Sequence, residues 1–183
     1  MLTDEKKNWQ KLNLKANKIK LIAMDVDGVL TDGSIVLGVK EELKLFNVQD
    51  GMGINLAKQA GLIVAFITGR KSRSVSRRAK ELGIEEVYQN SKDKEKTLMH
   101  LITKYGIEKN EVAYIGDDIM ELIPFRKTGF KIAVSNAAKE VKEMADYITV
   151  NTGGNGAVRE TIELILKSQK KWDKLIKQYR GSQ

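Results

Sequence analysis

The sequence predicts an α/β fold with a doubly wound, mostly parallel (Rossmann-like) sheet. Short apolar runs alternate with longer amphipathic stretches through most of the 183 residues, and this alternation indicates βαβ units. The apolar runs are almost continuous, as expected for strands buried on both faces of a parallel sheet. Glycines follow three of the amphipathic stretches, where a left-handed residue commonly ends a helix: Gly61, Gly83 and Gly106.

The individual elements follow from these patterns. The expected strands are residues 21–26, 62–67, 86–89, 112–115, 130–134 and 147–150. The expected helices are 51–60, 72–82, 93–105 and 137–145, followed by one long amphipathic helix over 157–180. Within 72–82, for example, Val75, Ala79 and Leu82 recur at helical spacing.

One segment breaks the alternation, directly after the first strand. Residues 33–47 contain two short β-like runs separated by GVKE, which predicts an inserted β-hairpin. We therefore expect a single domain over residues 1–183, with the hairpin insert at about 33–47 and a C-terminal helical tail at about 157–183.

The composition is that of a globular protein. Hydrophobic residues make up 42% of the chain and charged residues 31%, which excludes a disordered chain. The chain has no cysteine, so it has neither disulfides nor thiolate metal sites. The longest apolar run, residues 62–67, is far shorter than the roughly 20 residues of a membrane span. The N-terminus lacks the apolar segment of a secretory signal. We expect a cytoplasmic protein with no membrane contact.

The net charge of +8 is concentrated at the two ends of the chain. Residues 1–20 contribute +4 and residues 167–183 contribute +5, which leaves −1 for the middle. Because the folded middle is not basic and no nucleic-acid module is visible, we expect no nucleic-acid partner. The basic tails are either solvated helix faces or a source of positive field for an anionic substrate.

Polar residues gather where the expected strands end. In an open parallel sheet, ligands bind outside the carboxyl ends of the strands. A single cluster there is also typical of an ordinary turn, since Asp favours turns and caps. Four clusters at one edge predict a site: Asp25 and Asp27; Thr68, Gly69 and Arg70; Asp93 and Lys94; Gly116, Asp117 and Asp118.

These side chains suit phosphoryl transfer. In an extended segment Asp25 and Asp27 share a face, and they repel unless a cation lies between them or one holds a proton. Asp117 can add a third carboxylate, and oxygen ligands favour Mg²⁺. A hydroxyl from Thr68, an ammonium from Lys94 and a metal ion suit a transferring phosphoryl group. A carboxylate can then act as nucleophile, through an aspartyl-phosphate intermediate.

The motifs resemble a known family. DVDGVLTD, ITGR, DK and GDD, in this order and spacing, resemble the four motifs of the haloacid dehalogenase superfamily of phosphatases. FNVQDG, YQN and GGNGAVRE are further similar to its 3-deoxy-D-manno-octulosonate 8-phosphate (KDO 8-phosphate) phosphatases. The resemblance covers about residues 18–168. It implies a phosphatase of lipopolysaccharide sugar biosynthesis with a small hairpin insert and no large cap domain.

The resemblance also implies catalytic roles for four residues. Asp25 is then the nucleophile and a Mg²⁺ ligand. Asp27 is the general acid and base, and its backbone carbonyl binds Mg²⁺. Thr68 binds the phosphoryl oxygens. Lys94 neutralises the phosphoryl group and steadies Asp25, although spacing alone does not distinguish Lys94 from neighbouring lysines.

The metal and substrate sets extend to four further residues. Asp117 is implied as the third metal carboxylate, with Asp118 oriented behind it. Gly69 and Arg70 join Thr68 and Lys94 as expected substrate-binding residues. Arg70 is a planar bidentate donor that suits the substrate carboxylate. It can equally be an ordinary surface arginine.

The chain departs from the family pattern at four places. The family usually has Arg at Gln49, an aromatic residue at Met52, Gly at Asn90, and an Asp-Leu-Pro segment where Glu121 begins. We expect these departures to affect the sugar contacts and the oligomer surface but not the phosphoryl-transfer residues.

The resemblance implies a homotetramer, in which the hairpin and C-terminal tail of a neighbour close the site over a small sugar-acid phosphate. One alternative is a phosphatase of a nine-carbon sialic-type acid 9-phosphate, whose members tend to carry an acidic residue at the position of Arg70. Another is a non-catalytic oligomerisation module of the same fold. Such modules often lose the motif carboxylates, whereas Asp25, Asp27 and Asp117 are all present.

Overall fold

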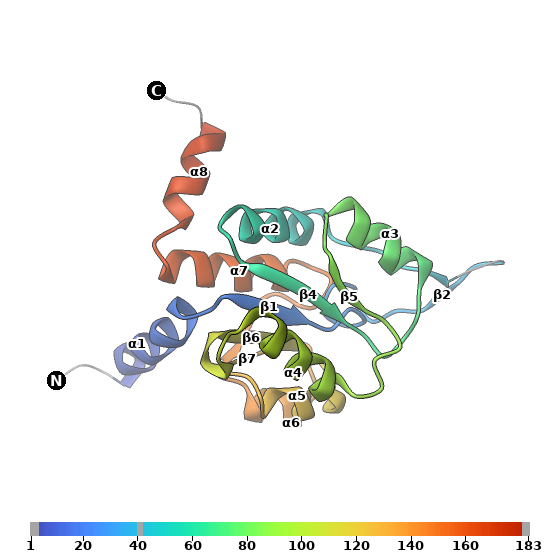
Figure 1. Ribbon diagram of the computed structural model, residues 1–183, viewed down its shortest axis with the longest axis horizontal. Coiled ribbons are helices and arrows are strands. Elements are labelled where there is room, and N and C mark those ends of the chain that lie inside the picture. Colours follow the sequence, from blue (N-terminus) through green and yellow to red (C-terminus); the bar gives the residue numbers. More distant parts are fainter. Residues whose placement is uncertain (1–3, 40–41, 181–183) are drawn as a thin grey trace.

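A computed structural model describes residues 4–39 and 42–180 of the chain. Its main sheet has six strands, and each neighbouring pair is parallel. In chain order they are β1 (Leu21–Met24), β4 (Ile63–Ile67), β5 (Glu86–Tyr88), β6 (Val112–Gly116), β7 (Phe130–Ala133) and β8 (Tyr147–Ile148). The predicted α/β fold with a parallel sheet is confirmed (Figure 1).

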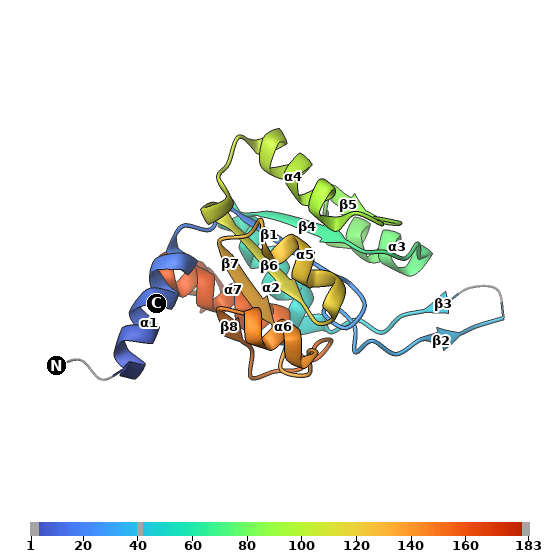
Figure 2. The same ribbon diagram turned by 90° about the horizontal axis from the view of Figure 1, so that it is seen from below.

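Helices cover both faces of this sheet (Figures 1 and 2). One face carries α2 (Val48–Gln59), α3 (Arg73–Glu81) and α7 (Ala157–Ser168), and the other carries α4 (Lys94–Tyr105), α5 (Leu122–Phe125) and α6 (Lys139–Met144). Two 3-10 turns, η1 (Lys109–Glu111) and η2 (Ile119–Glu121), flank β6. The core between the layers is aromatic and aliphatic, with Phe66, Tyr114 and Phe130 almost fully buried.

The strand order places a crevice beside β1. The spatial order is β5-β4-β1-β6-β7-β8, so the chain builds the sheet outward on one side of β1 and then returns to build the other side. Doubly wound sheets bind ligands where the direction reverses, outside the carboxyl ends of the strands. That point lies here between β1 and β6, the strands that Asp25 and Asp117 follow.

Two element boundaries near this crevice differ from the expectation. The first strand ends at Met24, two residues early, because the Val26 carbonyl accepts N–H groups of the following turn, including that of Leu30 at 2.9 Å. Helix α2 begins at Val48 rather than at residue 51. The Asn47 side chain caps it by accepting from the Gln49 N–H at 2.7 Å.

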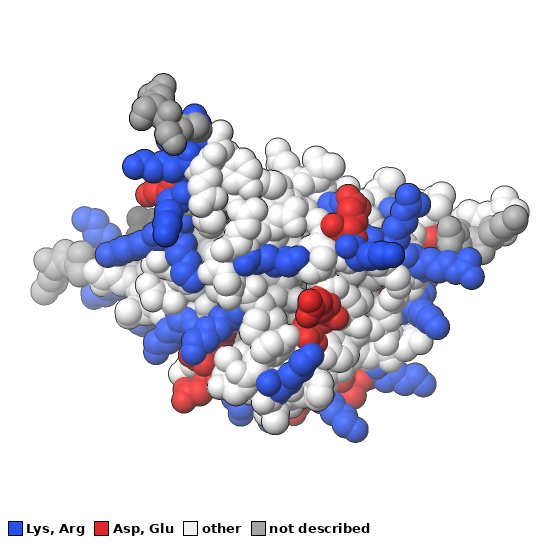
Figure 3. All heavy atoms as spheres, turned by 45° about the horizontal axis from the view of Figure 1, so that its top comes forward, with Lys and Arg blue, Asp and Glu red and all other residues white. Residues whose placement is uncertain are grey.

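The prediction of one long C-terminal helix is wrong. Two helices replace it, α7 and α8 (Trp172–Arg180), because Lys170 adopts a left-handed φ of 56°. Helix α8 projects from the end of the molecule opposite to the hairpin (Figure 1), and Lys and Arg side chains gather on that projecting end (Figure 3). The N-terminal segment forms α1 (Asp4–Asn17), which lies against α7.

The predicted hairpin is confirmed. Strands β2 (Val36–Leu37) and β3 (Glu42–Leu43) pair antiparallel and extend beyond the carboxyl edge of the main sheet (Figure 2). Its described residues expose several apolar side chains, including Leu37 and Leu45. None of the helices in the described parts of the chain is long and apolar enough to span a membrane.

Candidate active site

The four polar clusters meet around one cavity of about 530 Å³ at the carboxyl ends of the strands. It is lined by members of each cluster: Asp25 and Asp27, Gly69 and Arg70, Lys94, and Asp117 and Asp118. Gly33 and Ile35, at the base of the hairpin, complete one wall. The prediction that these clusters come together at one sheet edge is therefore confirmed.

Asp25 lies in the floor of this cavity. It follows β1 directly, and its N–H donates to the Ile115 carbonyl of β6 at 3.1 Å. The side chain is buried, with Lys94 Nζ 2.9 Å from Asp25 Oδ1. Burial raises the pKa of Asp25 to about 6; the Lys94 charge opposes this effect and the Glu121 charge adds to it.

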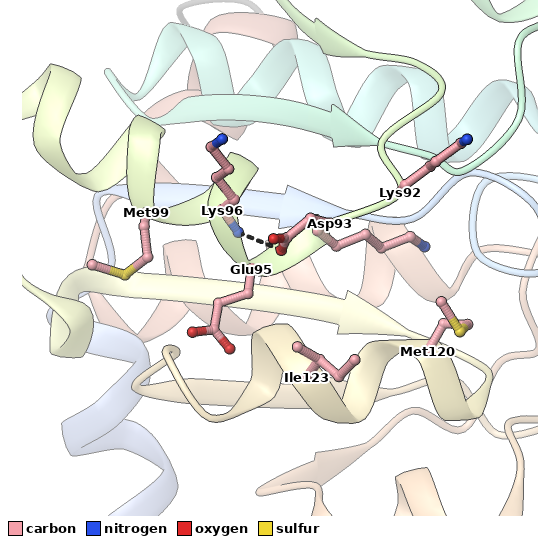
Figure 4. Close-up of a pocket in the computed structure, with 8 residues that line it drawn as sticks. Lys92, Asp93, Glu95, Lys96, Met99, Met120 and Ile123 are labelled. Carbon is pink, nitrogen blue, oxygen red and sulfur yellow. Dashed lines mark hydrogen bonds between the residues drawn. The ribbon is translucent and has the colours of Figure 1, made fainter.

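Lys94 is the cation of the site. Asp93 caps α4 by accepting from the Lys96 N–H at 2.8 Å (Figure 4), which places Lys94 in the first turn of the helix. Lys94 is buried, whereas Lys92 and Lys96 are exposed. Burial disfavours its charged form, but the carboxylates of Asp25 and Glu121 raise the pKa of Lys94 overall, so it stays charged.

Three carboxylates form a cluster beside this cation. One oxygen each from Asp25, Asp117 and Glu121 lie within 4.8 Å of one another. Burial, followed by the charges of Asp25 and Glu121, raises the pKa of Asp117 to about 7. Asp117 Oδ1 is buried, and no described group donates a hydrogen bond to it. A set of crowded, undersatisfied oxygen donors fits a hard divalent cation such as Mg²⁺.

Glu121 corrects one expectation. It was placed outside the phosphoryl-transfer residues, but it is 1% exposed, and its Oε1 lies 2.5 Å from Lys94 Nζ. Its Oε2 accepts from the Asp118 N–H at 3.0 Å. Asp117 and Glu121 do not share a helix, because Asp118 is extended and η2 contains only Ile119–Glu121, so their spacing gave no signal that both acids join one cluster.

Gly28 makes room for the acid cluster. A Cβ atom at Gly28 would lie 1.9 Å from Asp117 Oδ2, and the residue has a left-handed φ of +88°. Both the close approach and the backbone conformation therefore require glycine. The loop after β1 can reach the end of β6 only with this residue in place.

Asp27 faces a different set of partners. Its Oδ1 forms a short ion pair with Lys44 Nζ from the hairpin, and Arg70 Nε lies 3.9 Å from its Oδ2. Lys44 also contacts Glu42 at 2.6 Å, and Glu42 in turn pairs with Arg70. Asp25 and Asp27 thus line one cavity but point to separate partners, since the chain leaves the extended conformation at Met24. Sequence reasoning missed Lys44 and Glu42, because nothing in the two-residue strand β3, or in the residue directly after it, marks a functional side chain.

The remaining expected residues lie at the edges of the cavity. Thr68 is buried; its hydroxyl accepts from the Arg70 N–H at 3.3 Å, and Gly69 and Arg70 rather than Thr68 line the wall. Asp118 caps η2 by accepting from the Ile119 N–H at 2.8 Å. Its charge is a further, smaller contribution to the raised pKa of Asp117.

A second cavity of about 560 Å³ adjoins the first and shares Lys92, Lys94 and Met120 with it (Figure 4). It lies between the start of α4 and the η2–α5 segment. Its apolar lining comes from Met99 of α4 and from Met120 and Ile123 of the η2–α5 segment, which are labelled in Figure 4.

Two distant segments hold the loop that carries Asp25. The Gly154 N–H donates to the Val29 carbonyl at 2.9 Å, and a Cβ at Gly153 would lie 1.7 Å from the Gly28 carbonyl oxygen. Asp50 accepts from the Gly156 N–H at 3.2 Å and from the Arg159 N–H at 2.8 Å. The FNVQDG and GGNGAVRE segments therefore meet behind the site and support it.

Asn90 keeps the backbone geometry that a glycine would have at its place. Its φ is 55°, in the left-handed region, and its N–H donates to the Arg70 carbonyl at 3.4 Å. Asparagine is one of the residues that tolerate this conformation. This departure from the family pattern is therefore accommodated beside Arg70.

Comparisons with known proteins agree with this geometry. A sequence profile for haloacid dehalogenase-like hydrolases matches residues 85–162. The chain is 44% identical over 160 residues to the 3-deoxy-D-manno-octulosonate 8-phosphate phosphatase KdsC of Escherichia coli K12, which covers 87% of this chain and 85% of that protein.

Solved structures are similar over most of their length. The Moraxella catarrhalis 3-deoxy-D-manno-octulosonate 8-phosphate phosphatase, in complex with a magnesium ion, a phosphate ion and a KDO molecule, has a TM-score of 0.90 and 50% identity, covering 93% of this chain and 98% of that chain. The cobalt-bound deoxy-D-mannose-octulosonate 8-phosphate phosphatase of Haemophilus influenzae has a TM-score of 0.83 and 38% identity, covering 85% and 92%.

Proposed function

The chain belongs to the haloacid dehalogenase-like hydrolases, and within them to the family of the 3-deoxy-D-manno-octulosonate 8-phosphate phosphatases; from this premise we propose that it hydrolyses KDO 8-phosphate to KDO and phosphate. The observation that carries the proposal is the group formed by buried Asp25, buried Lys94 and half-buried Asp117 at the switch point of the sheet. The chain that carries this group is 50% identical to a phosphatase whose structure holds magnesium, phosphate and KDO.

The acid cluster would hold the metal. Asp25, Asp117 and Glu121 offer the carboxylate oxygens, and the resemblance adds the backbone carbonyl of Asp27. When bound, Mg²⁺ supplies positive charge to the phosphoryl oxygens and offsets the mutual repulsion of the carboxylates. The side chain of Asp27 lies outside the cluster and pairs with Lys44 instead, so its proton transfer does not compete with metal binding.

The side chains then divide the reaction into two steps. The Asp25 carboxylate attacks phosphorus while the bond from phosphorus to the sugar oxygen breaks, and Asp27 gives its proton to that oxygen. Water next attacks the aspartyl phosphate and gives a proton to Asp27, releasing phosphate. Lys94 holds Asp25 and balances the phosphoryl charge, while Thr68 and Gly69 bind its oxygens.

We propose that Arg70 recognises the sugar carboxylate. It lines the cavity, about half of its side chain is exposed, and it is anchored on Glu42. The cation favours the eight-carbon acid over the nine-carbon alternative, because the relatives that act on nine-carbon acids tend to have an acidic residue here. Asp118 would support Asp117 from the cap of η2.

The proposal extends to the assembly of several copies of this chain. The exposed apolar side chains of the hairpin suit contacts with further copies, in a cytoplasmic homotetramer built from one catalytic domain per chain. The basic helix α8 lies at the end of the molecule opposite to the hairpin (Figure 1), which favours closure of a neighbour's site by α8 over closure of its own.

The test is phosphate release from purified protein with Mg²⁺. We expect kcat/KM for KDO 8-phosphate to exceed that for a nine-carbon sialic-type acid 9-phosphate by at least about tenfold, the ordinary scale of discrimination by a binding pocket. A chelator should abolish the activity and Mg²⁺ should restore it. Hydrolysis of neither sugar-acid phosphate in the presence of Mg²⁺ would overturn the proposal.

A further inference from the structure

We propose that Lys44 of the hairpin is a positioning residue for proton transfer: through Oδ1 it holds the Asp27 side chain that gives its proton to the leaving sugar oxygen. This inference rests on the proposed function, since it assigns a residue to one step of that reaction.

The contacts of Asp27 are asymmetric. Oδ1 takes the short ion pair with Lys44 Nζ. Oδ2 is buried, no described group donates a hydrogen bond to it, and Arg70 Nε remains 3.9 Å away. The Lys44 contact therefore holds the Asp27 carboxyl group by one of its two oxygens.

The Lys44 side chain is buried rather than exposed to solvent. Its side chain is only 1% exposed, although it comes from a hairpin whose apolar side chains are largely solvent-exposed. Burial disfavours its charged form, but contacts with Asp27 and Glu42 raise the pKa of Lys44 overall. A buried lysine that stays charged fixes its partners more firmly than a solvated one, because it has few other acceptors.

Glu42 ties this contact to the substrate-facing wall. It binds Lys44 at 2.6 Å and also pairs with Arg70, so Asp27, Lys44, Glu42 and Arg70 alternate in charge. The row runs from the general acid through the hairpin to the proposed carboxylate ligand. A displaced hairpin would therefore release Asp27 and Arg70 together.

The step that Lys44 serves balances as follows. The bond from phosphorus to the sugar oxygen breaks, the electron pair stays on that oxygen, and the proton on Asp27 moves to it. The alcohol leaves neutral and Asp27 becomes an anion, which Lys44 stabilises through Oδ1. Lys44 itself neither gains nor loses a proton.

A comparison of two leaving groups tests this role. A sugar alkoxide needs a proton as it leaves, whereas nitrophenolate does not, so kcat/KM for KDO 8-phosphate and for p-nitrophenyl phosphate separates proton transfer from the rest of catalysis. We expect Lys44→Met to lower kcat/KM about 100-fold for the sugar phosphate, within the range for general acid catalysis, and less than about fivefold for the aryl phosphate.

Three controls accompany this variant. Lys44→Arg keeps a cationic donor and should restore most of the activity on the sugar phosphate. Lys139→Met removes a lysine that also pairs with a glutamate, Glu143 at 3.6 Å, but on the surface, and should behave as wild type. In an Asp27→Asn background, Lys44→Met should cost almost nothing further, because the residue acts through Asp27.

Equal losses on both substrates, or an undiminished effect in the Asp27→Asn background, would overturn the proposal. Should Lys44→Met fail to fold, Lys44→Gln gives the same comparison with a neutral donor, judged by the same two ratios. If the wild-type protein hydrolyses neither sugar-acid phosphate, the proposed function fails. If it hydrolyses the sugar phosphate but Lys44→Met lowers kcat/KM equally for the sugar phosphate and the aryl phosphate, only the role of Lys44 fails.

Discussion

Buried and half-buried acids occur in two regions of this protein, and the groups that surround them differ between the two. Behind the site, Asp50 accepts from the N–H groups of Gly156 and Arg159 at the start of α7. Glu160 accepts from the Tyr147 hydroxyl, from the N–H groups of Val150 and Asn151, and from the Asn151 side chain. These carboxylates tie loops to a helix.

At the carboxyl edge of the sheet the acids face one another instead. Asp25, Asp117 and Glu121 share one ammonium, Lys94 Nζ, which contacts the first and last of them. Burial raises the pKa values of both Asp25 and Asp117. The same residue type therefore stabilises the fold where backbone N–H groups surround it, and opposes the fold where other carboxylates surround it. Only the second arrangement requires a cation.

The largest expected effect is a loss of activity without a loss of stability. Asp25→Asn should lower kcat/KM by about 10⁴-fold or more, as removal of a catalytic nucleophile does in other enzymes. Its midpoint of thermal unfolding without Mg²⁺ should stay equal or rise, since one like charge leaves the cluster. Phosphate release and a thermal melt measure the two.

Asp32→Asn is the matched control for that variant. Asp32 lies in the same loop, where its Oδ1 accepts from the Ser34 N–H at 2.9 Å, as expected for a turn residue, and asparagine keeps that acceptor. It should retain full activity. A comparable loss in both variants, or a marked loss of stability in Asp25→Asn, would contradict the contrast between the regions.

The second largest effect is a loss of stability with little change in activity. Asp50→Ala leaves the N–H groups of Gly156 and Arg159 without their acceptor in a buried place. We expect the free energy of unfolding to fall by about 2–3 kcal/mol, the cost of two unsatisfied donors. Activity per folded molecule should change little. Denaturant unfolding gives the loss, with Asp173→Ala on the exposed α8 as the control. A stability equal to wild type would show that these contacts of Asp50 do not stabilise the fold.

The smallest effect is a pH dependence. The pKa values of Asp25 and Asp117 rise from 3.8 to about 6 and about 7 in the folded, metal-free protein. Between these values the native chain binds more protons than the unfolded chain. Their contribution to stability is therefore complete at low pH and is lost as the pH rises through this window.

Mg²⁺ must displace those protons. Its affinity should therefore weaken about tenfold per pH unit from about pH 7 to about pH 6, where one proton leaves on binding, and about 100-fold per pH unit below that, where two protons leave. Melting curves with increasing Mg²⁺ at several pH values measure this, and Asp117→Asn should flatten the dependence. Stabilisation by Mg²⁺ that is the same at pH 5 and pH 8 would contradict it.

Much of the site could be predicted because the chemistry lies in short motifs at strand ends. Asp25, Lys94 and Asp117 each follow or begin a regular element, and the parallel sheet brings those ends together. Glu121 was misjudged, since it looked like a departure from the family pattern rather than a member of the cluster. The break between α7 and α8 was missed because Lys170 shows no glycine or proline signal for its left-handed conformation.

The sequence by itself determined the fold class, the order of the elements and the carboxylate and lysine set, because periodicity and motif spacing are local properties of the chain. The tertiary structure decided which acids face one another and which are held by backbone donors. It also decided that Lys44 of the hairpin reaches Asp27 and that Asp50 reaches the start of α7. These contacts join residues far apart in the chain or on either side of an insert, and only packing determines such distances.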